Sequence, residues 1–359
     1  MIQTFSSTIR RKEMDAVLTC MVDEKTGPGE LNTRFIQALK EFTGCDGAVA
    51  FRSPFIALSY ALKAIDLPAG TPVMLSALAP FWQYDAVEKL GYKPLVLDVE
   101  EQTGLVNVQT VQQGISEGGR LLILHESMGI LPEIEEIVAL GIPVIEDISH
   151  SIGAVLPEKS DEAFDGTEKK QGKKQNRRAG SFGIFSILGL EEFDTITGGG
   201  GAVLLAPQRR DWIVLKKYTD AASRTDILPD INSVLALVQL KEFNRNEQAR
   251  KNLFAVFQRA LMSGKNRTFV RQPDEGSTIW SFPVVLNGSV KDVKQYASRK
   301  EIEIQPAYSD SVISRLQDEQ SKDLKISKAL FLRTVLFPLY PRLGSETAAK
   351  IAKVLGTLP

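Results

Sequence analysis

The sequence contains few cysteines and few histidines, and its charges almost cancel. Its 359 residues include two cysteines, two histidines, 43 basic and 44 acidic side chains, so the net charge at pH 7 is −1. Cys20 and Cys45 are too few for a disulfide framework, which favours a reducing compartment. The balanced charge provides no electrostatic basis for binding nucleic acid, and we expect no such partner.

Long apolar runs are missing as well, and we expect no signal peptide. No run approaches the ~20 apolar residues that a membrane-spanning helix requires. The first residues, MIQTFSS, lack the basic region and apolar core of a signal peptide. We therefore expect a soluble, cytoplasmic protein without a membrane partner. The apolar content of 43% is enough for one large or two moderate hydrophobic cores.

What the sequence does contain is an alternation of short apolar runs and helix-length amphipathic segments. The runs are rich in Val, Ile and Leu and lie at 47–51, 72–76, 94–98, 120–124 and 143–146. Such runs suit strands that are buried on both faces of a parallel sheet. Helical patterns lie between them, at 56–65, 84–90 and 133–140. The alternation predicts a doubly wound α/β domain.

The rhythm changes in the last third of the chain. A long helical pattern runs from about residue 231 to 262 and is followed by strand patterns at 278–286 and 334–339. Helical patterns near 290–298 and 346–355 complete this region. We interpret it as a smaller α+β domain, so that residues 1–240 form the large domain and residues 241–359 the small one.

Residues 157–178 break the pattern, because 12 of these 22 residues are charged and only Ala163 and Phe164 are apolar. Such a segment cannot bury a face, and it is predicted to be a mobile surface loop. A charged loop usually has no function of its own. Binding of phosphate or of an acidic partner is the less favoured alternative.

Three motifs stand in the middle of the chain: VIEDISHSIGA at 144–154, SFGIFS at 181–186 and TGGGGAV at 197–203. Together they resemble the signature of the DegT/StrS family, and the similarity extends over almost the whole chain. The resemblance implies a fold-type-I aminotransferase, with a mixed, mostly parallel sheet sandwiched by helices and a smaller C-terminal α+β domain. It also implies a homodimer, pyridoxal phosphate (PLP) as cofactor, and nucleotide-linked keto-sugars of polysaccharide biosynthesis as ligands.

The same resemblance places a cofactor pocket around three residues. In the family, an aspartate at the position of Asp147 pairs with the pyridine nitrogen and strengthens the ring as an electron sink. His150 falls where the family has a glutamine or histidine against the ring hydroxyl, and Ser186 matches a serine that binds the phosphate. The alternative is that Asp147 and Ser186 cap backbone groups and that His150 is a core histidine.

Two parts of this pocket depart from the family pattern. The Ser-Gly-Thr turn that binds the phosphate is replaced by Ser53-Pro54-Phe55, and a proline has no N–H to donate to an anion. The aromatic residue that stacks on the pyridine ring is replaced by Pro80, although Phe81 or Trp82 could compensate. Both departures weaken the expected cofactor site while leaving the helix starts intact.

The lysine that holds PLP as a Schiff base is missing. No lysine occurs from residue 175 to 215, and the segment Glu191, Glu192, Phe193 occupies the region where the family has it. A histidine cannot replace it, because the two histidines of the chain match other family positions. A carboxylate with a raised pKa is an alternative base, although exposed loop acids are the simpler interpretation of both glutamates. Displaced lysines at 216–217 or 173–174 have no reason to reach the pocket.

We therefore predict a degenerate family member, a pseudoenzyme without ordinary transaminase activity, with no catalytic lysine and no metal site. Its vestigial pocket comprises Asp147, His150, Ser186, Ser53, Phe81 and Trp82. Such a protein acts as a binding, regulatory or partner subunit, and binding a nucleotide-sugar without converting it is one form of that role. The alternative is an active enzyme that uses PLP or its aminated form (PMP) on nucleotide-linked keto-sugars, as an aminotransferase or a dehydratase-like variant.

Overall fold

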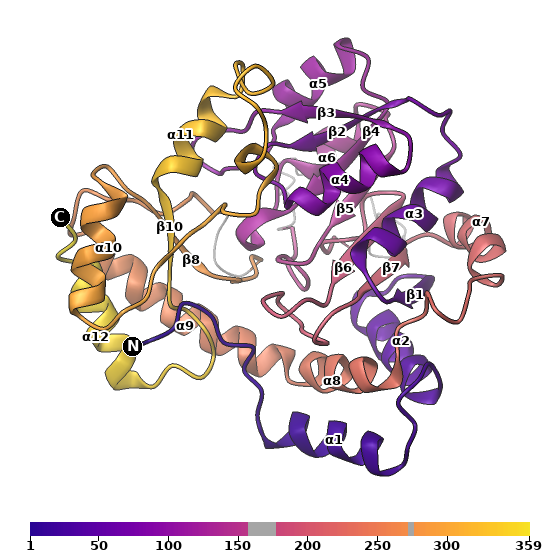
Figure 1. The fold of residues 1–359 in the computed structure, drawn as a ribbon, viewed down its shortest axis with the longest axis horizontal. Helices are drawn as coiled ribbons and strands as arrows, with labels where there is room; N and C mark the ends of the chain where they lie inside the picture. The colour runs from indigo at the N-terminus through magenta and orange to yellow at the C-terminus, as the bar shows by residue number, and fades with distance from the viewer. Residues whose placement is uncertain (157–176, 272–275) are drawn as a thin grey trace, which may run out of the picture.

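The computed structural model describes residues 1–156, 177–271 and 276–359 (Figure 1). The charged segment predicted as a loop lies outside the described residues except for its last two positions. There, the Arg177 guanidinium lies 2.7 Å from the Glu135 carboxylate, and Arg178 donates a hydrogen bond to the carbonyl oxygen of Phe42. These contacts attach residues 177 and 178 to the helices that contain Glu135 and Phe42.

A seven-stranded sheet forms the centre of the larger part of the molecule. Its strands are β1 (Gly47–Phe51), β2 (Pro72–Ser76), β3 (Lys93–Leu97), β4 (Leu121–His125), β5 (Val144–Asp147), β6 (Phe185–Gly189) and β7 (Ala202–Ala206). Their spatial order is β1-β7-β6-β5-β4-β2-β3. The pairs between β6 and β3 are parallel, whereas β7 is antiparallel to both of its neighbours. The sheet is mixed and mostly parallel, which confirms the predicted fold class.

Helices cover both faces of this sheet. On one face lie α3 (Pro54–Ile65), α4 (Phe81–Lys89) and α7 (Arg209–Thr219), which enclose one apolar cluster with the strands. On the other face lie α2 (Glu30–Thr43), α5 (Val108–Ser116), α6 (Ile134–Val138) and α8 (Asp230–Lys241). Because each face is covered, side chains of both orientations along the central strands are apolar, as the continuous apolar runs predicted.

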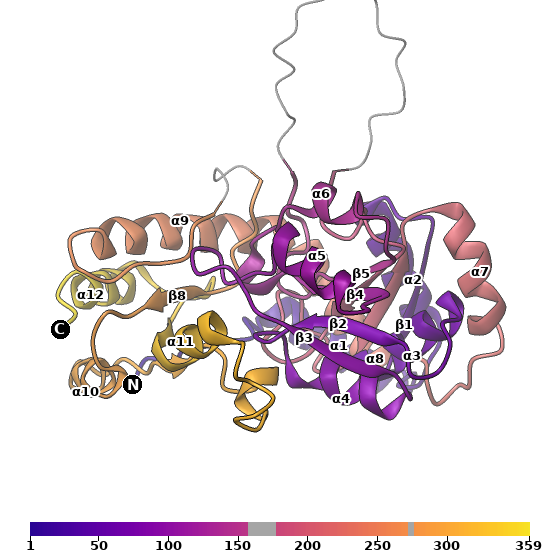
Figure 2. The same ribbon diagram turned by 90° about the horizontal axis from the view of Figure 1, so that it is seen from above.

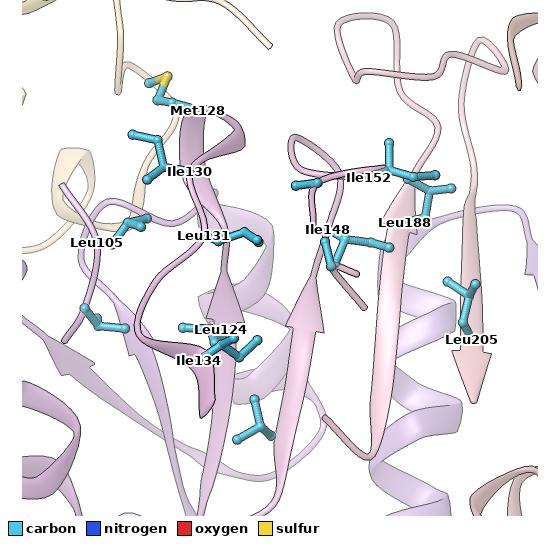
Figure 3. Packing of buried hydrophobic residues seen from close by; sticks show 14 of the residues in the cluster. Leu105, Leu124, Met128, Ile130, Leu131, Ile134, Ile148, Ile152, Leu188 and Leu205 are labelled. Carbon is cyan, nitrogen blue, oxygen red and sulfur yellow. The ribbon is translucent and has the colours of Figure 1, made fainter. Parts of the chain in front are cut away.

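The second of these clusters reaches the ends of the central strands. Figure 3 shows Ile148 and Leu188 near each other at that end, with Ile152 above them and Leu124 lower down, next to Ile134. The side chains of Ile148, Leu188, Ile152 and Leu124 are fully excluded from solvent. Such close packing leaves the polar residues that follow β4 and β5 little freedom to move.

A smaller sheet lies beside the first one (Figure 2). Its strands are β8 (Phe282–Val285), β9 (Gln305–Pro306) and β10 (Thr334–Phe337), antiparallel in the order β8-β10-β9. Helices α9 (Phe243–Leu261), α10 (Val290–Arg299) and α12 (Ser345–Leu355) form a separate apolar cluster with it, and α11 (Lys325–Arg333) precedes β10. Two short 3-10 turns, Ser127–Gly129 and Val312–Ser314, complete the described elements. None of the described helices is both long and apolar enough to cross a membrane.

The predicted helix from 231 to 262 is in fact two helices. The chain turns at Glu242 between α8 and α9, where that residue has φ −90° and ψ 1°. Lys12 and Arg245 both pair with the Glu242 carboxylate, at 2.6 and 2.7 Å. No proline or glycine marks this break, so the sequence pattern predicts one continuous helix across it. The predicted domain boundary after residue 240 falls at the end of α8 and stays a prediction.

The N-terminal segment connects the two sheets. Ile2 forms a bridge with Ile302 beside the small sheet, and the Thr4 amide donates to the Glu303 carboxylate at 3.0 Å. The chain then passes to α1 (Arg11–Val22), which packs on α8 (Figure 1). On the way, residues 5–8 line the cavities next to residues 192–195. This segment is called the N-terminal strap (residues 2–9) below.

Candidate functional site

The polar residues of the site stand where two neighbouring parallel strands end. His125 is the last residue of β4 and Asp147 is the last residue of β5, and the two are directly paired in the register of the sheet. The carboxyl ends of parallel strands are where open α/β sheets present groups to ligands. Both side chains are almost fully buried, at 5% and 1% exposure.

Asp147 accepts four hydrogen bonds from within the chain. Gln83 Nε2 and His125 Nδ1 lie 2.7 and 2.8 Å from Oδ2. The hydroxyl and the amide of Ser149 lie 2.5 and 3.2 Å from Oδ1. Burial alone would raise the pKa of Asp147, but the charge and hydrogen bond of His125, with the Ser149 bond, hold it below its usual value. A carboxylate offers about four acceptor positions, so this one is ionised and saturated.

His150 stands beside this pair. Its Nδ1 accepts a hydrogen bond from the Met128 amide at 3.3 Å, which assigns the proton of the neutral ring to Nε2. The Trp280 ring covers one face of the imidazole, with 3.7 Å between the centroids, and the His125 centroid is 5.0 Å away. Burial and then the nearby His125 lower the pKa of His150 well below its usual value, against the opposing charge of Asp147.

A cavity of about 350 Å³ opens against these two histidines. We call it the strand-edge cavity, and the side chains that line it are mostly aromatic, apolar or hydroxyl-bearing. They belong to Phe5, Leu78, Pro80, His125, Ser127, Met128, His150, Phe193, Trp280, Gln305, Pro306, Ala307, Tyr308, Ser309, Asp310, Ser311 and Leu336. The described lining thus includes no lysine and no arginine, and its one acid, Asp310, is paired with Arg315 at 2.5 Å.

The two serines predicted to hold a phosphate lie elsewhere. Ser186 is paired with Glu146 in the register of β5 and β6, so its side chain points to the opposite face of the sheet from that of Asp147. Its hydroxyl donates to the carbonyl oxygen of Gly180 at 3.2 Å. Ser53 caps α3, because its Oγ accepts from the Ile56 amide at 3.2 Å. Neither serine lines the strand-edge cavity.

The two aromatic residues predicted to compensate for Pro80 also face away from the cavity. Phe81 stacks on Tyr84 with 5.7 Å between the ring centroids, and the Arg315 guanidinium lies 4.3 Å from the Phe81 centroid. Trp82 packs against the apolar cluster beneath α3. Pro80 itself lines the cavity and forms a bridge with Ser311. The structure therefore brings Asp147 and His150 together but leaves Ser53, Ser186, Phe81 and Trp82 apart from them.

The segment at residues 191–193, which was predicted to stand in place of the lysine, is held from two sides. Glu191 and Glu192 are exposed, as expected for loop acids. The carbonyl oxygen of Phe193 accepts from Trp280 Nε1 at 2.7 Å, and the Phe193 ring stacks on Phe5 of the N-terminal strap at 4.8 Å. The Ser7 hydroxyl donates to the carbonyl oxygen of Glu192 at 3.1 Å. The strap and Trp280 together fix the loop above the cavity.

Lys216 and Lys217, two of the lysines considered as displaced replacements, do not line the cavity. Lys216 and Lys217 lie on α7, as predicted, and are exposed there. Lys216 lies 4.0 Å from Asp220. The pair at 173–174 falls outside the described residues. Among the residues that line the strand-edge cavity, no side chain carries an amine.

Sequence reasoning missed several residues of this site. Gln83 lies inside a helix with no motif around it, and Trp280 and Phe5 are far from the strand ends in sequence. Ser149 could have been found, because a serine two residues after an aspartate at a strand end commonly closes a turn onto that carboxylate. The role of His125 as partner of Asp147 depends on the strand pairing, which follows only from the three-dimensional register.

These residues do not fit PLP. The acceptor positions of Asp147 are occupied by Gln83, His125 and Ser149, which leaves none for a pyridinium N–H. Pro54 removes one amide from the start of α3, and the Ile56 amide is already capped. The described lining of the cavity provides no cation for a phosphate and no amine for a Schiff base.

Comparisons with known proteins agree on the family. The model of the DegT/DnrJ/EryC1/StrS aminotransferase family matches residues 7–356. EpsN of Bacillus subtilis (strain 168), for which a PLP-dependent aminotransferase activity is proposed, is 22% identical over 356 residues, covering 91% of this chain and 87% of EpsN.

Solved structures share the fold over nearly the whole length. One is a Streptococcus pneumoniae protein in its PLP form, for which a sugar aminotransferase activity is proposed. It has a TM-score of 0.83 at 15% identity, and the match covers 97% of this chain and 95% of that protein. The dehydratase ColD, a GDP-4-keto-6-deoxymannose-3-dehydratase with bound GDP-perosamine, has a TM-score of 0.82 at 14% identity, covering 99% and 100%. By the match of the family model over almost its entire length, this chain belongs to the DegT/DnrJ/EryC1/StrS aminotransferase family.

Proposed function

We propose that this protein binds a sugar ligand in the strand-edge cavity without forming a Schiff base, and that it acts as a binding or partner subunit rather than as a transaminase. The observation that carries the proposal is the saturated carboxylate of Asp147, which holds four hydrogen bonds from its own chain. The members of the family are PLP-dependent. This chain retains their fold, but the carboxylate that would pair with the cofactor already accepts hydrogen bonds from Gln83, His125 and Ser149.

The lining of the cavity supports the binding of an uncharged polar group, such as the sugar ring of a larger ligand. Four hydroxyl-bearing residues, Ser127, Tyr308, Ser309 and Ser311, share it with aromatic and apolar side chains. A few convergent polar groups in a mainly apolar cavity are typical of small-molecule sites. The related fold of ColD holds a nucleotide-linked sugar, and we propose the same ligand class here. Its sugar ring would enter the cavity, and its phosphates would stay outside, because no described cation lines the interior.

We also propose that the protein is a homodimer, as the family resemblance implies. Exposed apolar side chains on α1 support an interface there: Met14, Leu18 and Met21 are 55%, 58% and 53% exposed. Light scattering coupled to size exclusion would measure the mass directly. A mass of 39.6 kDa, that of one chain, would contradict this part of the proposal.

The first test is a titration with PLP followed by borohydride reduction and peptide mapping. We expect a spectrum of free aldehyde that dialysis removes, and only scattered, substoichiometric labelling of surface lysines. One lysine peptide labelled stoichiometrically would contradict the proposal and would identify a displaced Schiff-base lysine. Calorimetry with GDP-mannose and UDP-N-acetylglucosamine would then measure binding in the absence of PLP, which the proposal requires for at least one nucleotide-sugar.

A matched pair of variants makes this test sharper. Phe193→Lys places an amine on a residue that lines the strand-edge cavity, and Glu192→Lys places the same amine on its neighbour, which does not line it. If the cavity no longer accepts PLP, both variants should label as weakly as the unmodified chain. Stoichiometric labelling of Phe193→Lys alone would show that only the lysine has been lost and that the rest of the cofactor site persists.

Family membership favours a second candidate function, an active PLP- or PMP-dependent enzyme on nucleotide-linked keto-sugars. The match of the family model to residues 7–356 and the similarity to ColD support it. The geometry of Asp147 and the cation-free lining of the cavity stand against it. Release of ammonia or of a glutamate-derived keto acid from a nucleotide-linked keto-sugar mixture in the presence of PLP would favour this candidate over the first.

A further inference from the structure

His125 is held in one tautomer by a buried, ionised carboxylate. Its Nδ1 lies 2.8 Å from Asp147 Oδ2, and Asp147 is fixed in turn by Gln83 and Ser149. Because the ionised carboxylate can only accept, Nδ1 carries a proton in either charge state of the ring, and in the neutral form of the imidazole the lone pair lies on Nε2. An aspartate that orients a histidine in this way prepares it to take a proton at the other nitrogen.

His125 lines the strand-edge cavity with one of its ring nitrogens unbonded by the part of the chain that the structure describes. The two nitrogens of an imidazole point in roughly opposite directions, so Nε2 points away from Asp147, and His125 lines the cavity. Within the described residues, no hydrogen bond is formed to this atom. Because the lone pair of His125 Nε2 has no hydrogen-bond partner in the described chain, it is available to a ligand.

His150 adds a donor next to this acceptor. Its Nδ1 is engaged with the Met128 amide, so its Nε2 carries the proton, and its ring centroid is 5.0 Å from that of His125. Trp280 and the Met128 bond hold the ring in place. A neutral imidazole N–H of this kind can stabilise a developing oxyanion beside a general base.

From these three observations we propose that His125 is a general base that exchanges the proton on a carbon next to the carbonyl of an uncharged hydroxyketone, without any cofactor. The proposal rests on the proposed function, which places a sugar in this cavity with no Schiff base. The site thereby acquires an activity, keto–enol exchange, that requires neither lysine nor phosphate. Asp147 serves as the positioning residue, since it acts through His125.

The step balances without a co-reactant. The C–H bond next to the carbonyl breaks, its proton moves to His125 Nε2, and its electron pair forms the C=C bond of an enolate. His150 Nε2–H donates a hydrogen bond to the resulting oxyanion. On reversal, the protonated histidine returns a proton that has exchanged with solvent to the same carbon. No electrons leave the substrate, and the net change in D2O is the replacement of one hydrogen by deuterium.

The experiment is proton NMR of the full chain in D2O with three unphosphorylated probes: dihydroxyacetone, D-xylulose and D-fructose. We expect loss of the signal of the hydrogen next to the carbonyl of at least one probe, about 100-fold or more faster than with His125→Gln. Asp147→Asn should slow the exchange by a similar factor, because an amide that donates to Nδ1 selects the wrong tautomer. Lys350→Ala, at an exposed ion pair far from the cavity, is the control and should exchange as the unmodified chain does.

Chemical rescue separates catalysis from a structural role. His125→Ala leaves a space of the size of an imidazole, and added imidazole should restore the exchange if His125 is the base. Misfolding of the variant would not be corrected by imidazole.

The outcomes distinguish the two proposals. Exchange by the unmodified chain no faster than by His125→Gln, while calorimetry shows that a probe binds, would overturn the catalytic inference and leave the binding function intact. Stoichiometric labelling by PLP and borohydride would instead overturn the proposed function. Faster exchange of fructose 6-phosphate than of fructose would also contradict the inference, because a phosphate has no cation in the described lining.

Discussion

The indole ring of Trp280 lies face to face with the imidazole ring of His150, with 3.7 Å between the centroids and 13° between the planes. Trp280 precedes the small sheet, whereas His150 follows the strand β5 of the large one. The same indole donates to the carbonyl oxygen of Phe193. One side chain thus connects the wall of the cavity to the loop that contains Phe193.

Trp280→Phe tests this connection. Phenylalanine can still stack on His150, but it cannot donate to the Phe193 carbonyl oxygen, so we expect a loss of about 1 kcal/mol in the free energy of unfolding. Urea denaturation would measure the loss, and hydrogen exchange would show faster exchange of amides 191–195. Unchanged protection of this loop would mean that the N-terminal strap alone holds it.

Much of the fold follows from the sequence. The apolar runs at 47–51 and 72–76 coincide with β1 and β2, and the predicted helix at 346–355 begins one residue late. These elements are predictable because burial on both faces of a sheet demands an unbroken apolar run. The antiparallel pairing of β7 is not predictable from such runs, since a buried strand looks the same in either direction. The break at Glu242 gave no local signal either.

The site was predictable only in part. The position of Asp147 at a strand end can be predicted from the sequence, and the sequence has no lysine from residue 175 to 215. The saturation of that aspartate cannot be predicted, because Gln83 and His125 reach it across 64 and 22 residues of sequence. Ser186 was expected in the pocket on the strength of a motif, while strand alternation sends its side chain to the other face. Contacts made by the register of a sheet require the structure.

Asp194 gives the protein a pH dependence of known sign. The residue as a whole is half-buried, but its carboxylate is buried, and this burial raises the pKa of Asp194 to about 8. The charges of Asp147 and Glu191 act in the same direction, whereas the hydrogen bond from the Glu191 amide lowers the pKa. The folded state therefore binds a proton that the unfolded state has released, so stability falls as pH rises from about 4 to about 8. The slope is at most about 1.4 kcal/mol per pH unit.

Asp194→Asn should remove this contribution, because asparagine keeps an acceptor for the Glu191 amide without an ionisable group. Urea unfolding of both proteins between pH 5 and pH 9 would measure the difference. We expect the variant to gain stability relative to the unmodified chain as pH rises, with no further gain above about pH 8. Parallel curves at every pH would show that the carboxylate of Asp194 is ionised in the folded protein.

Gly189 leaves room for the hydrogen bonds around Asp147. A Cβ atom at this position would lie 2.4 Å from Asp194 Oδ2 and 2.8 Å from the Ser149 hydroxyl. Gly189→Ala should therefore displace Ser149, and we expect a loss of about 1–3 kcal/mol in stability together with weaker ligand binding. Gly288→Ala is the matched control, because its Cβ would meet only one atom, at 3.6 Å. Denaturation and calorimetry on both variants would check this, and equal effects would contradict it.

Two further acids, Glu126 and Glu146, are completely buried next to His125 and Asp147 in the chain. Glu146 accepts from the amides of Gly180, Phe182 and Gly183, and Glu126 is bonded by Ser151. Burial, and then the charge of Glu146, raise the pKa of Glu126 well above its usual value, and burial also raises the pKa of Glu146. Two neighbouring carboxyl groups that are both buried cannot both be ionised, so we assign one proton to Glu126, whose pKa is raised the more.

Glu126→Gln replaces that proton by an amide of the same shape. A raised pKa in an acid means stability that is present at low pH and is lost as pH rises, so the variant should be at least as stable as the unmodified chain at pH 8 and lose its advantage toward pH 4. Glu126→Ala is the contrasting variant, because it leaves Glu146 and the Ser151 hydroxyl without this partner and should cost about 1–3 kcal/mol. Urea unfolding at both pH values would measure the three proteins. If the glutamine variant were the less stable protein at pH 8, Glu126 would have to be ionised in the fold, and Glu146 would have to carry the proton instead.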